Sequence, residues 1–177
     1  MRAAMGLVVT MGLFIFGCAH TPTQPGARAD LVREANRTVA RMEAQDPSLR
    51  PVLDSSAGYV VFPKVGQGGF LIGGGAGSGV LFEHGQPIHF AQLTNVQAGA
   101  LIGGQRIAQI VVFRDPRALN ELRNGRFNFG AQASAVMLRS GAAANANFEK
   151  GTAVFVEPVR GAMANASVGG ERIRLVL

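Results

Sequence analysis

Apolar positions along the chain follow two patterns, which predict a helix followed by a sheet. From Asp30 to Ala44 they recur at three- and four-residue steps, the spacing of an amphipathic helix. Beyond this segment they form short runs or alternate with polar residues, as in Tyr59–Phe62 and Ile107–Phe113, which is typical of strands. This order predicts an α+β fold in which an N-terminal amphipathic helix packs on an antiparallel sheet.

The segment Gly58–Glu83 determines the shape expected of that sheet. Eight glycines fall within residues 66–79, and each costs a helix about 1 kcal/mol relative to alanine, so the segment is not helical. Glycine in strands marks bends, bulges or a close approach of backbone. We therefore expect a curved, glycine-rich antiparallel sheet or a partly closed barrel, with strands at Tyr59–Phe62, Gly69–Ile72 and Val80–Phe82 joined through a corner and a glycine-rich turn.

Further strands and one short helix complete the predicted fold. The helix occupies residues 115–124, because Asp115 is a good N-cap, Pro116 suits the first helical position and Gly125 follows the end. The remaining strands are predicted at Ile88–Leu93, Thr94–Ile102, Ile107–Phe113, Phe127–Met137, Thr152–Val156, Met163–Val168 and Arg172–Leu177. We find no second core, so residues 30–177 form one domain.

Residues 1–17 are predicted to be a signal peptide. A basic Arg2 precedes the apolar run Met5–Phe16, which is shorter than the ~20 residues of a transmembrane helix. The run ends at Gly17-Cys18 and resembles the lipobox of bacterial lipoproteins. Cys18 is the only cysteine of the chain, so it has no partner for an internal disulfide.

The lipobox resemblance implies that Cys18 carries several acyl chains. Together they form a lasting anchor, since each buried methylene contributes about 0.8 kcal/mol. Ala19 is not the aspartate that retains lipoproteins in the inner membrane, so we expect the outer membrane, with the domain facing the periplasm. Residues 18–29 are polar and contain proline and glycine, which predicts a lipidated, flexible tether.

Composition and charge narrow the possible partners. The net charge of +6 suits an anionic partner, either a membrane or a nucleic acid. With one tyrosine, no tryptophan and scattered arginines, the chain lacks the aromatic platform in a basic groove that binds nucleic acid. Nucleic acid is therefore not expected as a partner.

The residue types also argue against an enzyme. His84 and His89 flank a turn, and no acidic residue or cysteine lies at metal-ligand spacing from them. The glycine-rich segment has no Gly-Lys-Ser/Thr ending and no following helix, so it does not match a phosphate-binding loop. We expect no catalytic residue, no metal and no cofactor.

Two groups of residues are candidates for contact with anions. Arg33, Arg37 and Arg41 fall four apart on the first helix, either as the solvated face of a packed helix or as a face lying against lipid headgroups. Lys64 follows a proline, where it is either an exposed turn residue or part of an anion site. In the second reading, free backbone amides of Gly66, Gly68 and Gly69 form an anion-binding nest beside it.

Several segments of the chain resemble the SYLF family of lipid-binding domains. The most specific are GYVVFPKVG at Gly58–Gly66 and GVLFE at Gly79–Glu83. The resemblance continues through QAGALIGGQ at Gln97–Gln105 and the strand Val111–Phe113 with its following helix. It covers roughly residues 30–177.

The resemblance implies non-catalytic binding of lipid. Eukaryotic members are described as binding phosphoinositides and in some cases actin, whereas bacterial members are taken to bind phospholipid. Actin is not expected outside a bacterial cytoplasm. We therefore expect binding of anionic phospholipid, and the alternative is a structural or interaction protein that docks another envelope component through its basic face.

Overall fold

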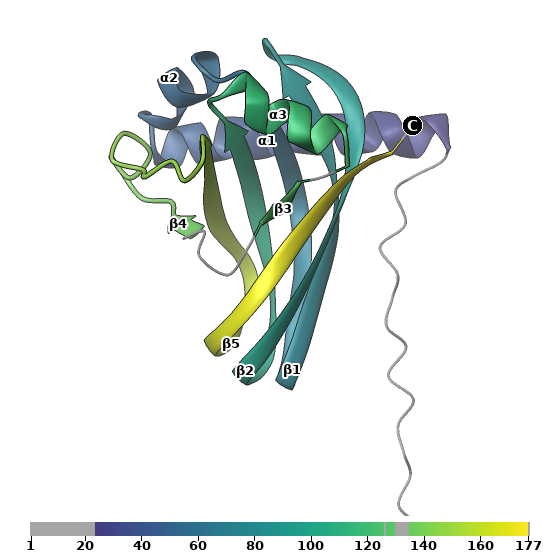
Figure 1. Ribbon diagram of the computed structural model, residues 1–177, viewed down its shortest axis with the longest axis vertical. Helices are drawn as coiled ribbons and strands as arrows, with labels where there is room; N and C mark the ends of the chain where they lie inside the picture. The colour runs from purple at the N-terminus through teal and green to yellow at the C-terminus, as the bar shows by residue number, and fades with distance from the viewer. Residues whose placement is uncertain (1–23, 126, 130–134, 177) are drawn as a thin grey trace, which may run out of the picture.

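The computed structural model describes residues 24–125, 127–129 and 135–176, and it shows an α+β fold (Figure 1). Within these residues the chain forms three helices and five strands. In chain order they are α1 (Pro25–Gln45), α2 (Leu49–Asp54), β1 (Gly58–Glu83), β2 (Gln86–Phe113), α3 (Pro116–Arg123), β3 (Asn128–Phe129), β4 (Ala135–Met137) and β5 (Thr152–Val176). The predicted fold class is confirmed.

The strands form a mostly antiparallel sheet that is not closed. Its order is β1-β2-β5-β3, and β4 pairs in parallel with β5. The three long strands have 26, 28 and 25 residues, several times the usual five or six. Figure 1 shows why they are so long: each runs away from the helices, bends sharply at the far end and returns.

The bend divides the sheet into two half-sheets. The first half-sheet contains residues 58–69 of β1 with their partners in β2 and β5, and the second contains residues 73–83 with theirs. A register shift between Phe70 and Ile72 marks the bend in β1. Beyond it the strand returns over itself, so that a methyl group added to Gly75 would lie 2.6 Å from the carbonyl oxygen of Gly66.

The predicted division into many short strands was wrong. Tyr59–Phe62, Gly69–Ile72 and Val80–Phe82 are parts of one strand, and the turns expected at Gly103-Gly104 and Pro158–Gly161 lie inside β2 and β5. Glycine and proline bend these strands and shift their register, but the ladder of hydrogen bonds continues on both sides. The segment Phe127–Met137 contains β3 and β4, with residues 130–134 outside the described part.

The domain has two hydrophobic cores, where the sequence indicated one, because side chains alternate between the two faces of each strand. Val61, Ile110 and Phe155 of the first half-sheet belong to the core under the helices α1 and α2, to which Val80 and Phe82 of the second half-sheet also contribute. Their neighbours in sequence face the other way, so Phe62 and Val111 join a second core, to which α3 contributes Leu119 and Leu122. Because Leu81, Leu93 and Ile173 of the second half-sheet also belong to this core, it lies between the two half-sheets.

The helix boundaries differ from the prediction at one end. α1 begins at Pro25, five residues earlier than expected, because proline suits the first turn of a helix. The expected tether at residues 18–29 therefore overlaps the helix, and Cys18 lies outside the described residues. The end of α1 before Asp46-Pro47 is confirmed. None of the described helices has both the length and the hydropathy needed to cross a membrane.

The short helix has the boundaries that its sequence indicates. The Asp115 side chain accepts a hydrogen bond of 2.8 Å from the amide of Arg117, which satisfies one free donor of the first turn. Gly125 follows the helix with a φ of +66°, a conformation that glycine adopts without strain. Leu119 and Leu122 of this helix are buried.

The close contact within β1 makes a testable prediction at Gly79. A methyl group there would lie 2.5 Å from both the Val61 carbonyl oxygen and the Phe62 ring. We expect Gly79→Ala to lower the free energy of unfolding by about 2–3 kcal/mol, as overpacking does elsewhere, measured by urea denaturation. Gly66→Ala is the matched control, because nothing lies within 4 Å of the added methyl. Equal stability of the two variants would contradict the close contact.

Candidate functional site

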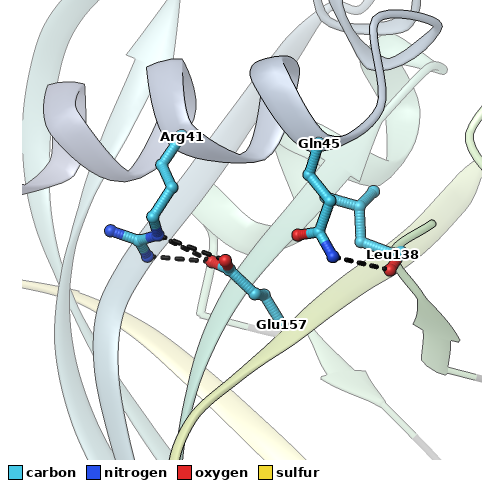
Figure 2. A network of polar contacts seen from close by, with 4 residues as sticks. All are labelled: Arg41, Gln45, Leu138 and Glu157. Carbon is cyan, nitrogen blue, oxygen red and sulfur yellow. Dashed lines mark hydrogen bonds and ion pairs between the residues drawn. The ribbon is translucent and has the colours of Figure 1, made fainter. Parts of the chain in front are cut away.

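α1 crosses the first half-sheet, and two ion pairs fix its direction. Near the middle of the helix, Glu34 lies 2.5 Å from the Lys64 ammonium of β1. Two turns later, the Arg41 guanidinium contacts Glu157 of β5 at 2.9 Å (Figure 2). Because β2 lies between β1 and β5, the helix spans all three strands. Figure 2 also shows Gln45 reaching the Leu138 carbonyl oxygen, at 3.3 Å.

All four cations predicted from the sequence lie on or beside α1. Arg33 pairs with Asp30 on the same helix, while Arg41 and Lys64 have the partners just described. Arg37 is exposed, and no described carboxylate lies within ion-pair distance of it. We call Arg33, Arg37, Arg41 and Lys64 the basic face.

The ion pairs of Arg33 and Lys64 are exposed on both sides and therefore weak, whereas Glu157, the partner of Arg41, is only 15% exposed. The side chains of Arg33, Arg41 and Lys64 are 61%, 48% and 60% exposed. Pairs of this kind contribute about 0–1 kcal/mol, because water competes for both charges. At Arg33 and Lys64 a phosphate oxygen can replace the carboxylate at little cost, so their ion pairs do not prevent these two cations from binding phosphate.

The glycine-rich turn predicted beside Lys64 is absent. Gly66, Gly68 and Gly69 lie in β1 and pair with Arg106, Gly104 and Gly103 of β2. A nest requires consecutive residues of alternating handedness, but none of the three glycines has a positive φ. The proposed nest of backbone amides was therefore wrong, since the backbone here is an extended strand.

Two further cations were missed by the sequence analysis. Arg106 of β2 and Arg160 of β5 are directly opposite one another in the ladder, and both are exposed. They are 54 residues apart in a chain of scattered arginines, so no local spacing connects them. Only the pairing of β2 with β5 brings them together.

A polar pair formed by the buried Gln109 and the partly buried Glu171 links the two half-sheets. Gln109, in the middle of an apolar run, donates hydrogen bonds of 2.9 and 3.0 Å to the two carboxylate oxygens of Glu171. Burial raises the pKa of Glu171, and the hydrogen bond from Gln109 opposes this only in part. Asn95 lies opposite Glu171 in the ladder, and its buried Oδ1 has no hydrogen-bond partner in the described part. When Glu171 is protonated, its carboxyl group becomes a donor on the strand position opposite this oxygen.

The described residues also include no group of three or more His, Cys, Asp and Glu side chains that could hold a metal ion. His84 and Gly85 form the turn between β1 and β2, both with positive φ. The features that gather chemically active groups are thus the basic face, the arginine pair and the Gln109–Glu171 pair.

Comparison with known proteins confirms the family resemblance. Residues 94–175 match the family described as Ysc84, Las17-binding protein actin regulator, which contains the SYLF domain. The matched part runs from the first third of β2 almost to the end of β5. A search of curated proteins found no match. The family match supports a lipid-binding or interaction role of a non-catalytic kind.

The raised pKa of Glu171 predicts how stability depends on pH. Above the ordinary pKa of about 4.5 the unfolded chain loses its proton while the folded chain keeps it, so Glu171 lowers stability as pH rises. Glu171→Gln keeps an acceptor for Gln109 and adds a donor opposite Asn95. We expect it to raise the midpoint of thermal unfolding by a few degrees at pH 7.

The pH dependence is the decisive part of this experiment. Below pH 4 both states of the wild-type protein are protonated, so the advantage of Glu171→Gln is expected to shrink. Glu121→Gln, on the exposed surface of α3, is the matched control and is expected to change little at either pH. A gain from Glu171→Gln that is the same at both pH values would contradict a partly buried carboxyl with a raised pKa.

Proposed function

We propose that the protein is a lipid-anchored envelope protein whose domain binds anionic phospholipid through the basic face, without catalysis. The observation that carries this proposal is the gathering of Arg33, Arg37, Arg41 and Lys64 on one exposed surface. The match to the SYLF family supports it, since that family is associated with lipid binding.

The energetics of the basic face favour a membrane as the partner. A cation near an anionic bilayer contributes about 1 kcal/mol, which is comparable to or larger than the exposed ion pairs it replaces. Arg37 has no such pair to give up among the described residues. The surface is open, which suits the many phosphates of a bilayer better than one enclosed small molecule.

The expected anchor holds this surface close to lipid. Seven residue steps separate Cys18 from Pro25, and a fully extended chain of this length spans at most about 25 Å. With acyl chains on Cys18, the start of α1 therefore stays within about this distance of the bilayer. We propose the outer membrane as the location and the periplasm as the side that the domain faces.

The alternative function is docking of another envelope component through the same basic face. The family description favours it, because it names a protein, Las17, as a binding partner of family members. The two functions differ in a simple way. Lipid binding depends on headgroup charge and does not need a second protein, whereas docking does.

Vesicle co-sedimentation tests the proposal. Full-length Cys18→Ser protein, which carries no acyl group, is expected to bind phosphatidylglycerol vesicles at low salt and phosphatidylcholine vesicles hardly at all. High salt is expected to weaken the binding, because exposed charges are screened. Arg37→Gln is expected to reduce affinity about fivefold, and Arg117→Gln, on α3, is the matched control. Failure to bind either vesicle would favour the docking alternative.

A second experiment tests the anchor. In a bacterium fed labelled palmitate, the wild-type protein is expected to take up label and to fractionate with the outer membrane. Cys18→Ser is expected to lose both properties, because the acylated sulfur is gone. Ala19→Asp is expected to keep the label and to move to the inner membrane. Labelling of the Cys18→Ser protein would contradict lipidation at this residue.

A further inference from the structure

The two opposite arginines, Arg106 and Arg160, lower the stability of the folded state, and no other feature of the fold accounts for their position. Arg106 and Arg160 occupy directly opposite positions of β2 and β5. Like charges at such positions destabilise a sheet, because opposite residues of neighbouring strands have Cα atoms only about 5 Å apart. In the part of the chain that the structure describes, no carboxylate forms an ion pair with either arginine.

Both arginines lie on the same side of the sheet as α1. Along β2, Ala108 and Ile110 belong to the core under α1 and α2, whereas Ile107 and Val111 face the other half-sheet. Arg106 is in phase with Ala108 and so lies on the α1 side. Its partner Arg160 occupies the same side, as does Glu157, which binds Arg41 of α1.

The pair lies next to the edge of α1 that carries the basic face. Burial raises the pKa of Tyr59, near the start of β1, and the negative charge of Glu43 of α1 raises it further. The edge of the helix that carries Glu43 therefore faces the beginning of the strand. The opposite edge carries Glu34, which reaches Lys64 farther along β1. Gly66, the next ladder position beyond Lys64 on that side, pairs with Arg106.

Open space lies at the β1 position opposite Arg106. Gly66 has no side chain, and no atom lies within 4 Å of where a Cβ would be. Across the sheet, Gly66, Arg106 and Arg160 therefore form a row with a bare position at one end and two cations at the other. We call it the arginine row. On the same side of the sheet, the carboxylates of Glu34 and Glu157 are already engaged by Lys64 and Arg41.

We infer that the arginine row is a binding subsite for the phosphate group of an anionic phospholipid. A guanidinium presents its N–H donors in a fork that matches phosphate oxygens, and two such groups on adjacent strands can share one phosphate. The bound charge removes the repulsion between the arginines. This inference rests on the proposed lipid binding and deepens it, because it assigns headgroup recognition to the sheet as well as to α1.

The basic face and the open geometry identify the source of the phosphate as a lipid. The row is exposed, and Gly66 at its end lies two positions from Lys64 of the basic face along β1, so a bilayer that contacts the basic face also brings phosphates to the row. Soluble phosphate esters share the same chemistry, and the experiment separates the two sources.

The test compares two double variants in the full-length Cys18→Ser protein. Arg106→Gln/Arg160→Gln removes the row, and Arg117→Gln/Arg139→Gln removes the same charge from exposed positions elsewhere. Binding to phosphatidylglycerol vesicles is measured by co-sedimentation. In parallel, thermal unfolding is followed with sn-glycerol 3-phosphate and with sodium chloride at matched ionic strength.

The row variant is expected to bind vesicles about tenfold or more weakly than the parent protein, and the control variant is expected to lose much less. Glycerol phosphate is expected to raise the unfolding midpoint of the parent protein and not that of the row variant. The row variant in chloride is expected to be at least as stable as the parent, since the repulsion is gone, so weaker binding is not a result of misfolding.

Other outcomes separate the subsite from the proposed function. Equal loss of vesicle binding in the two double variants would mean that only total charge matters, and it would overturn the subsite while the lipid binding stands. Protection by glycerol phosphate in a protein that binds no vesicle would overturn lipid as the source, and with it the proposed function. If glycerol phosphate gives no protection and the protein binds no vesicle, both the subsite and the proposed function are overturned.

Discussion

The fold depends on the contact of β1 with itself across its bend. Carbonyl oxygens of the first half of β1 lie only 2.5–2.9 Å from the positions that Cβ atoms on Gly75, Gly77 and Gly79 would occupy. Side chains at these alternate positions would separate the half-sheets. Their absence lets the sheet fold over sharply, so one inner face of each half-sheet is buried between them and the first half-sheet keeps an outer face for α1 and α2. Glycine at positions 75, 77 and 79 is thus a packing requirement.

The same bend explains where the charges lie. With the inner faces buried against each other, charged side chains on the strands must lie on outer faces, at edges or in pairs. Lys64, Arg106, Glu157 and Arg160 lie on the α1 side, whereas Glu171 lies inside and keeps its proton more readily than an exposed carboxyl. Gln109 accommodates it with two hydrogen bonds. The basic surface is therefore a consequence of the way the sheet folds over, with α1 laid across it.

Features set by local sequence signals, such as the ends of a helix, were predicted well. The continuity of the long strands was not. The boundaries of α3 follow from Asp115 and Gly125, whose effects operate within one helical turn. The strands were divided at Gly103-Gly104 and at Pro158, although both positions lie inside long strands. Glycine and proline indicate that a strand bends, but whether its ladder continues depends on partners far away in the chain. The nest beside Lys64 failed for the same reason, because Gly66 is paired with Arg106.

The sequence by itself determined the α+β class, the short capped helix, the amphipathic face of α1 and the resemblance to the SYLF family, because periodicity, capping and motifs are local properties. It also placed Arg33, Arg37 and Arg41 on one helix. Only the tertiary structure decided that Lys64 meets Glu34 and that Arg106 lies opposite Arg160. Register between strands sets these contacts, and a shift of one residue would turn every side chain to the other face. That register is fixed by the burial of whole faces, which no short segment of the sequence contains.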